Sequence, residues 1–236
     1  MGSQGGFIGR IGNVIHYKMG DKFYTRSAPK KYKQTKATKA KSIEFGMAST
    51  IGKMIRQALQ PIIFETDDRK MHTRLVGQIY SWLQIARHNP ASDVTQPDLK
   101  FFKFTTGNPS LSARWQIVLK KSIPSPGQIQ ISIPSFVPSS AFRSPARASS
   151  VTCRIASVVI DVEKKEEIGR ALDEINYTLD ENKVASRKIF QKLPMPPGSL
   201  LITGLCVQYF TTRLHRKLPT TDKLYKPSEI IYAVHN

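Results

Sequence analysis

Cysteine, acidic side chains and long apolar runs are all scarce in this chain of 236 residues. Its two cysteines, Cys153 and Cys206, are too few for a disulfide framework, so we expect reduced and buried thiols. No stretch approaches the roughly eighteen apolar residues that a transmembrane helix needs. The first residues also lack the basic region and apolar run of a secretory signal. We therefore expect a cytoplasmic protein with no membrane partner.

Acidic residues number 17 against 36 lysines and arginines, which gives a net charge of +19 and a pI of about 10.1. The excess is uneven, because residues 1–41 carry ten basic side chains and a single acid, Asp21, whereas residues 42–98 are balanced. Hydrophobic residues make up 40% of the chain, which is enough for a core and excludes a fully disordered protein. A positive charge of this size favours a polyanionic partner: nucleic acid, an anionic membrane face or an acidic protein surface.

Recognisable catalytic and metal-binding motifs are missing from the sequence. None of the five histidines stands at zinc-ligand spacing from another histidine or cysteine. The chain contains neither a Gly-x-Ser-x-Gly nor a Walker A motif. An acidic cluster around Asp161 and Glu163 is interrupted by Lys164 and Lys165, which favours a solvated loop over a cation site. We therefore expect no enzymatic activity, no cofactor, no metal and no small-molecule substrate.

The segment Gly9-Arg10-Ile11-Gly12 has the Gly-x-x-Gly form of the KH loop, which clamps a nucleic-acid backbone. In a KH domain that loop joins two helices, whereas a strand-like run follows it here. We expect instead that these glycines let the chain turn or let two backbones approach closely.

The N-terminal part combines a strand pattern with a basic segment. Residues 14–18 alternate as a strand does, residues 19–22 have turn chemistry, and residues 23–26 read as a return strand. We predict a β-hairpin there, followed by a lysine-rich arm at residues 27–41. Because the arm holds six lysines and no acid, we expect it to repel itself and to lack regular secondary structure.

Two helices are predicted after the arm. The first begins between Thr38 and Ser42, carries apolar residues at a spacing of four, and ends at Pro61. The second follows Asp68, whose charge suits a helix N-terminus, and stops before the Asn-Pro pair at residues 89–90. Joined by a short loop, the two helices can pack as a helical hairpin.

After residue 98 short β-rich runs alternate with prolines, serines and glycines, which is typical of an antiparallel β-sandwich. One of these segments, residues 164–173, can instead form one or two helical turns. The sequence therefore predicts an α+β protein in two parts. An N-terminal β-hairpin, basic arm and two-helix hairpin occupy residues 1–98, and an antiparallel β-sandwich occupies residues 99–236.

The candidate nucleic-acid-binding residues are basic side chains near aromatic ones, because such groups grip phosphates and stack on bases. Tyr32 lies inside the arm, and a second basic group lies beside Tyr209 and Phe210. The predicted site consists of Lys30, Lys31, Lys33, Lys36, Lys39, Lys41, Arg213, Arg216 and Lys217.

Several short motifs follow one another along the chain. They include Gly-Asn-Val at 12–14, Glu-Phe-Gly-Met-Ala at 44–48, Ile-Pro-Ser-Phe-Val-Pro at 133–138 and Leu-Cys-Val-Gln-Tyr-Phe at 205–210. In this order they resemble an uncharacterised protein family of Bacteroidetes over almost the whole chain. No activity is established for that family, so the resemblance implies no functional residue. The lysine-rich arm and the segment 213–217 depart from the family's pattern, which indicates that the high positive charge is a specialisation of this member.

Two functions compete on this evidence. The charge and the arm favour a non-enzymatic nucleic-acid-binding protein, with RNA or a ribonucleoprotein as partner. The alternative is a structural or assembly subunit of a large protein particle or surface machine, in which the arm contacts a neighbouring subunit. Salt distinguishes the two, because phosphate contacts weaken steeply as salt rises, whereas a sandwich-to-sandwich contact is far less sensitive.

Overall fold

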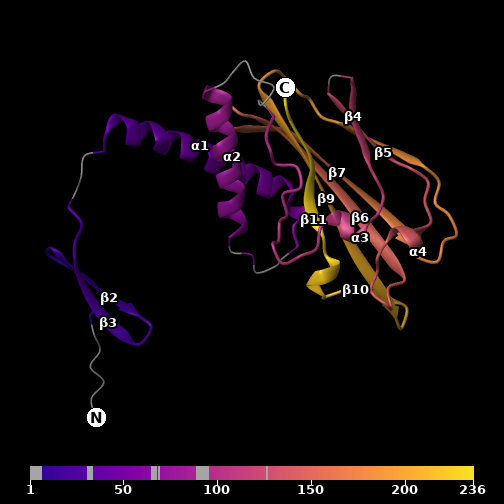
Figure 1. Ribbon diagram of the computed structural model, residues 1–236, viewed down its shortest axis with the longest axis horizontal. Coiled ribbons are helices and arrows are strands. Elements are labelled where there is room, and N and C mark those ends of the chain that lie inside the picture. The colour runs from indigo at the N-terminus through magenta and orange to yellow at the C-terminus, as the bar shows by residue number, and fades with distance from the viewer. Residues whose placement is uncertain (1–6, 31–33, 65–67, 69, 89–95, 126) are drawn as a thin grey trace, which may run out of the picture. The chain divides into compact units, whose positions relative to one another are not determined.

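The computed structural model describes residues 7–30, 34–64, 68, 70–88, 96–125 and 127–236 (Figure 1). Contacts within the chain divide it into two compact units, residues 1–41 and residues 42–236. The division falls inside helix α1 (Lys36–Ala58), and residue 98, where we expected a boundary, lies within the second unit. In the described part of the chain, no helix is long and apolar enough to cross a membrane.

The first unit contains a three-stranded antiparallel sheet of β1 (Gly9–Ile11), β2 (Val14–Met19) and β3 (Lys22–Ser27), in that order. The predicted hairpin is confirmed as β2 and β3, and β1 adds a third strand. Gly12 and Gly20 lie in the two turns with φ of 59° and 63°, which glycine adopts without steric cost. Because the Gly-x-x-Gly motif forms β1 and its turn, it is not the helix-joining loop of a KH domain.

Helix α1 begins at Lys36, earlier than the sequence predicted. Thr35 caps it, because its Oγ1 accepts the N–H of Thr38 at 3.1 Å and its carbonyl accepts the N–H of Lys39 at 3.0 Å. This cap and the alanines between the lysines favour the helix enough to offset charge repulsion. The expectation that the lysine-rich arm lacks regular secondary structure was therefore wrong from Lys36 onwards, and also at Ser27 in β3.

Both predicted helices are confirmed. Helix α1 is followed by a short 3-10 helix, η1 (Gln60–Ile62), which contains Pro61. Asp68 precedes α2 (Met71–His88) and accepts the N–H of Lys70 on its Oδ1 at 3.1 Å. Figure 1 shows α1 and α2 crossing rather than lying antiparallel as a helical hairpin, and both helices pack on a sheet of the second unit.

The second unit is built around a five-stranded antiparallel sheet. Its strands run in the order β10-β9-β6-β7, and β11 also pairs with β9. The segment for which we left a helical alternative forms the β6–β7 turn and the first part of β7. The bounds are β6 (Ser150–Asp161), β7 (Glu166–Thr178), β9 (Ser199–Arg213), β10 (Arg216–Pro219) and β11 (Ser228–His235).

A second antiparallel sheet covers one face of the first. Ile129 and Ile131 of this sheet share a core with Val151 and Cys153 of β6. Its strands are β4 (Lys120–Ser125), β5 (Gln128–Ile133) and β8 (Arg187–Lys192), and the short elements nearby are α3 (Leu111–Arg114), α4 (Pro138–Ala141) and η3 (Lys223–Tyr225).

The other face of the five-stranded sheet is covered by helices. Ala156 and Val158 of β6 belong to a core with Ile55 of α1 and Leu75 of α2. Gly204 of β9 allows η1 to pack close to the sheet, because a Cβ there would collide with the Ile62 side chain of η1. The α+β class and the antiparallel C-terminal strands are thus confirmed, and the helices form a layer on the sheet rather than a separate part.

Candidate nucleic-acid interface

Strand pairing gathers tyrosines and cations on one face of the N-terminal sheet. Tyr17 of β2 lies directly opposite Tyr24 of β3. Side chains two residues further along each strand share that face, as do the residues opposite them. We call this surface the tyrosine face, and it consists of Arg10, Ile15, Tyr17, Met19, Lys22, Tyr24 and Arg26.

The tyrosine face is positive, aromatic and open to solvent. The two tyrosine rings stack with their centroids 5.7 Å apart and their planes at 23°. The guanidinium of Arg26 lies 5.6 Å from the centre of the Tyr17 ring, in a cation–π contact. Tyr24 is 38% exposed, and the three cations of the face are exposed. Asp21, the single acid of the unit, lies in the β2–β3 turn and not on this face.

The opposite face of the same sheet carries exposed apolar side chains beside His16, Lys18 and Thr25, and we call its apolar part the apolar face (Phe7, Ile11, Val14 and Phe23). Phe7 is 56% exposed, Ile11 59% and Phe23 48%. No residue from 7 to 30 is buried, so this sheet has no core of its own. A small sheet needs a covered hydrophobic face for independent stability, and an exposed one marks an interaction surface.

The described lysines of the arm are exposed, but they belong to two kinds of structure. Lys30 lies in the segment after β3, whereas Lys36, Lys39 and Lys41 lie in the first turns of α1. Lys36 and Lys39 are neighbours on one side of the helix, and Lys41 is about 160° around the axis from Lys39. Three further residues of the arm, Lys31, Tyr32 and Lys33, lie outside the described residues.

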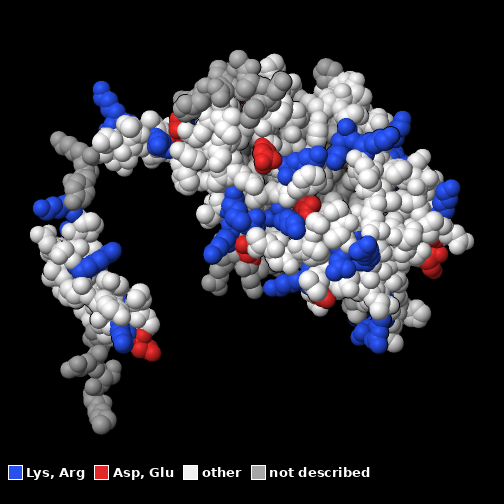
Figure 2. All heavy atoms as spheres, in the orientation of Figure 1, with Lys and Arg blue, Asp and Glu red and all other residues white. Residues whose placement is uncertain are grey.

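In the second unit, the structure brings Arg213 and Arg216 together at the tip of the β9–β10 hairpin, where they lie directly opposite each other. Lys217 follows in β10 and lies on the other face of the hairpin. All three side chains are exposed. Figure 2 shows Lys and Arg side chains spread over the visible surface of the second unit, with fewer Asp and Glu between them. The two arginines therefore form a compact cationic pair within a broadly basic surface.

Of the two aromatic residues expected beside this hairpin, Tyr209 is in the core and Phe210 is partly exposed. Tyr209 is fully buried, and its hydroxyl donates to the carbonyl of Arg114 at 3.0 Å. Burial raises the pKa of the Tyr209 hydroxyl. The interpretation of Tyr209 as a stacking partner for Arg213 and Arg216 was therefore wrong, because the alternation of β9 turns this ring inward.

The two cysteines are buried, as the sequence predicted, in the cores on opposite faces of the main sheet. Burial raises the pKa of Cys206 to about 12 and the pKa of Cys153 well above its ordinary value, so both stay protonated at neutral pH. Among the residues that the structure describes, no three His, Cys, Asp or Glu side chains are grouped so as to hold a metal. Asp161, from the acidic cluster, pairs with Lys164 at 3.4 Å.

The composition of the sequence identifies the arm lysines but does not identify the tyrosine face. The signal is nonetheless present, because Tyr17 and Tyr24 flank the Gly20-Asp21 turn symmetrically. A two-residue turn at that position pairs the tyrosines and places the cations two residues away on the same face.

No protein-family model matches the chain, and neither does any curated protein. The resemblance to the Bacteroidetes family therefore stays a prediction.

Proposed function

We propose that the protein binds nucleic acid, with RNA favoured, through the tyrosine face and the arm lysines. The observation that carries the proposal is the stacked, solvent-open pair of Tyr17 and Tyr24 with three cations on the same face. Bases stack on aromatic rings with about 1–3 kcal/mol per base and little sequence preference, while lysines and arginines neutralise phosphates. The combination suits a polyanion that carries flat rings.

Single strands fit this surface better than duplexes do. Stacking on a protein ring needs a base that is free of its neighbours, which loops and single strands supply. Lys30 follows β3 by three residues, and Lys36 and Lys39 lie in the exposed start of α1. These lysines lengthen the run of phosphate-binding groups beyond the sheet.

The test is a titration of a fluorescent single-stranded oligonucleotide at several salt concentrations. Replacing Tyr17 and Tyr24 by valine keeps strand propensity but removes the rings. We expect this variant to bind about tenfold more weakly with an unchanged salt slope, because no phosphate contact is lost. Replacing Arg10 and Lys22 by glutamine should instead flatten the slope by about 1.4, at about 0.7 for each contact.

The matched control is Phe190→Val in β8, which removes a 49% exposed strand aromatic from the second unit. It should leave the affinity unchanged. Failure of the wild type to bind more tightly than about 100 μM, the weak limit of non-specific binding, would reject the proposal. An equal loss in the control and in the tyrosine variant would reject the tyrosine face as the site.

The apolar face supports a second candidate function, that of an assembly subunit whose N-terminal sheet docks on a neighbouring subunit of a large protein particle. Its exposed Phe7, Ile11 and Phe23 are the kind of surface that burial in a protein contact stabilises. Such association persists at high salt, because apolar burial is not screened. Sedimentation of wild type and of the Ile11→Ser, Phe23→Ser double variant tests it: loss of a salt-resistant oligomer in the variant supports assembly, and a wild-type monomer at all concentrations opposes it.

We also interpret the two facing sheets of the second unit as the β-sandwich predicted from the sequence. The core that β5 and β6 share supports this interpretation. The helices α1 and α2 are then an added layer on the outer face of the larger sheet.

A further inference from the structure

A cavity of about 530 Å³ opens in the second unit between the segment that precedes α3 and the strands β4 and β11. Three lysines and one carboxylate line it: Lys100, Lys103, Lys121 and Glu229. Most of the remaining wall is apolar and includes Trp115. A hollow of this size, mainly apolar with a few polar groups, is the usual form of a small-molecule site.

The charges in this cavity are unbalanced. Glu229 is 3% exposed, and its Oε1 accepts the backbone N–H of Leu111 at 2.9 Å. Lys121 is half-buried, and its Nζ donates to the carbonyl of Ile231 at 3.4 Å. No ion pair joins the three lysines to a carboxylate among the described residues. The cavity therefore holds an excess of cationic groups that a bound anion can neutralise.

Burial shifts the pKa values of two of these groups. It lowers the pKa of Lys121, and the nearby charge of Lys100 lowers it further. Burial also raises the pKa of Glu229, although the N–H of Leu111 and the charge of Lys103 offset part of that rise. Both pKa shifts arise because a charged group is poorly hydrated in this site. A bound anion beside the lysines would raise the pKa of Lys121 again.

Two further features of the cavity wall are unusual for a purely structural surface. Trp115 is 2% exposed, and its indole Nε1 has no hydrogen-bond acceptor among the described residues. Phe101 has a φ of 68°, in the left-handed region, while its side chain is 66% exposed. A bulky residue rarely adopts this conformation, and such strain concentrates at ligand sites.

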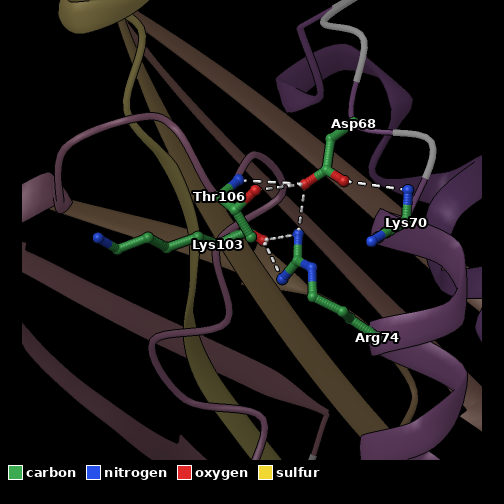
Figure 3. Close-up of polar contacts among 5 residues, drawn as sticks. All are labelled: Asp68, Lys70, Arg74, Lys103 and Thr106. Atoms are coloured by element: carbon green, nitrogen blue, oxygen red, sulfur yellow. Dashed lines mark hydrogen bonds and ion pairs between the residues drawn. The ribbon is translucent and has the colours of Figure 1, made fainter.

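A polar network fixes the wall that carries Lys103 (Figure 3). Both terminal nitrogens of Arg74 donate to the Lys103 carbonyl at 3.1 Å, and Arg74 pairs with the Asp68 carboxylate at 2.7 Å. The same carboxylate accepts the N–H of Thr106 at 3.1 Å. The Lys103 side chain extends away from this network (Figure 3). The backbone of the wall is therefore held in place, which reduces the entropy lost when a ligand binds.

We propose that this cavity binds a small organic anion, with one carboxylate or phosphate group carried on a flat apolar body. The anionic group lies among Lys100, Lys103 and Lys121, and the apolar body packs against the exposed Phe101 and Val118, beside the buried Trp115. The buried carboxylate of Glu229 disfavours a second negative charge on the ligand. The site lies in the second unit and is independent of the proposed nucleic-acid interface.

The experiment is isothermal titration calorimetry of the full chain with 2-naphthoate and with its neutral isostere 2-naphthamide. For a probe of this size we expect a Kd of about 1 mM or tighter for the carboxylate. The amide should bind at least tenfold more weakly, because it brings no charge. Lys121→Met should weaken naphthoate binding at least tenfold. Lys120→Met is the matched control, because Lys120 precedes Lys121 in β4 and its side chain therefore points to the opposite side of the strand. This variant should change the affinity less than twofold.

A second measurement uses the wild-type protein, so it does not depend on whether the lysine variants fold. The chain has two tryptophans, so the indole N–H resonance that disappears in Trp82→Phe identifies the resonance of Trp115. Naphthoate should shift the Trp115 resonance and leave that of Trp82 in place. Equal affinity for acid and amide, equal effects of the Lys120 and Lys121 variants, or an unmoved Trp115 resonance each overturns the proposal. The Tyr17, Tyr24 variant should bind naphthoate as the wild type does, so the two proposals can fail separately.

Discussion

Leu214 and His215 occupy a turn that suits neither of them. Both have positive φ, 47° and 61°, in the two-residue connection between Arg213 and Arg216. Leu214 is 94% exposed, so no packing compensates for its conformation. Turns of this kind favour Asn-Gly, and left-handed backbone costs other residues about 1–2 kcal/mol each. The chain thus keeps an unfavourable, exposed apolar residue between two cations.

Replacing this pair by Leu214→Asn and His215→Gly should stabilise the protein. We expect the free energy of unfolding to rise by about 1–2 kcal/mol, because both new residues tolerate positive φ. Urea denaturation followed by circular dichroism measures the change. Leu224→Asn, at a 52% exposed leucine without positive φ, is the control and should give no gain. A double variant no more stable than wild type would show that the turn is unstrained.

At the scale of elements, Asp68 connects the start of α2 to the segment that carries Lys103. Its carboxylate accepts from Thr106, Lys70 and Arg74. Burial alone raises the pKa of Asp68, but these hydrogen bonds and the charge of Arg74 outweigh it and hold the pKa below its ordinary value. A lowered carboxyl pKa means that the folded state favours the ionised form. The resulting stability is fully present above the ordinary pKa and is lost as pH falls through the lowered one.

Asp68→Asn should therefore destabilise the protein in a pH-dependent way. Near neutral pH we expect a loss of about 1–2 kcal/mol, because the hydrogen bonds to the charged group weaken. The difference from wild type should shrink as pH falls through the lowered pKa of Asp68, where the wild-type side chain also becomes neutral. Urea denaturation of both proteins across this range provides the measurement. A difference that does not vary with pH would mean that the charge contributes nothing.

The elements were predictable from the sequence to different degrees. An apolar spacing of four predicts α1 and α2 because a helix must bury such a stripe whatever covers it. That spacing does not indicate which element covers the apolar stripe. Strand β6 buries Val151 and Cys153 on one face and Ala156 and Val158 on the other, so it reads as an almost continuous apolar run. Such a run indicates a strand covered on both faces, but not that helices supply one cover.

The candidate sites differ in the same way. Composition is enough to find the arm lysines, and hairpin symmetry is enough to pair Tyr17 with Tyr24. The cavity needed the three-dimensional structure, because Glu229 meets the backbone of Leu111 across 118 residues of chain. Nothing local in the sequence relates these positions to Lys100 or Lys121. A site whose residues are brought together by long-range contacts has no characteristic sequence spacing from which it could be predicted.

At the scale of the whole molecule, the net charge of +19 makes salt the most informative variable. Replacing Lys30, Lys31, Lys33 and Lys36 with glutamine should flatten the slope of log affinity for a single-stranded oligonucleotide against log salt by about three units. The fold should persist, because the described members of this set are exposed. Titrations at four or more salt concentrations measure the slope.

A matched control set in the second unit consists of four exposed lysines: Lys120, Lys183, Lys188 and Lys192. If both sets change the slope equally, binding is spread over the surface and the arm is not its centre.

The absence of any buried residue from 7 to 30 has a consequence for affinity itself. A sheet without a core gains little stability from burial, so the free energy of strand pairing sets the fraction of free molecules that present the tyrosine face and the apolar face. The apparent Kd for any partner of either face is then the intrinsic Kd divided by that fraction. Changes that favour strand pairing at positions remote from the partner, in the β1–β2 or β2–β3 turn, tighten binding without a new contact. The occupancy of the ordered sheet in the free protein thus sets how strongly the chain holds whatever it binds.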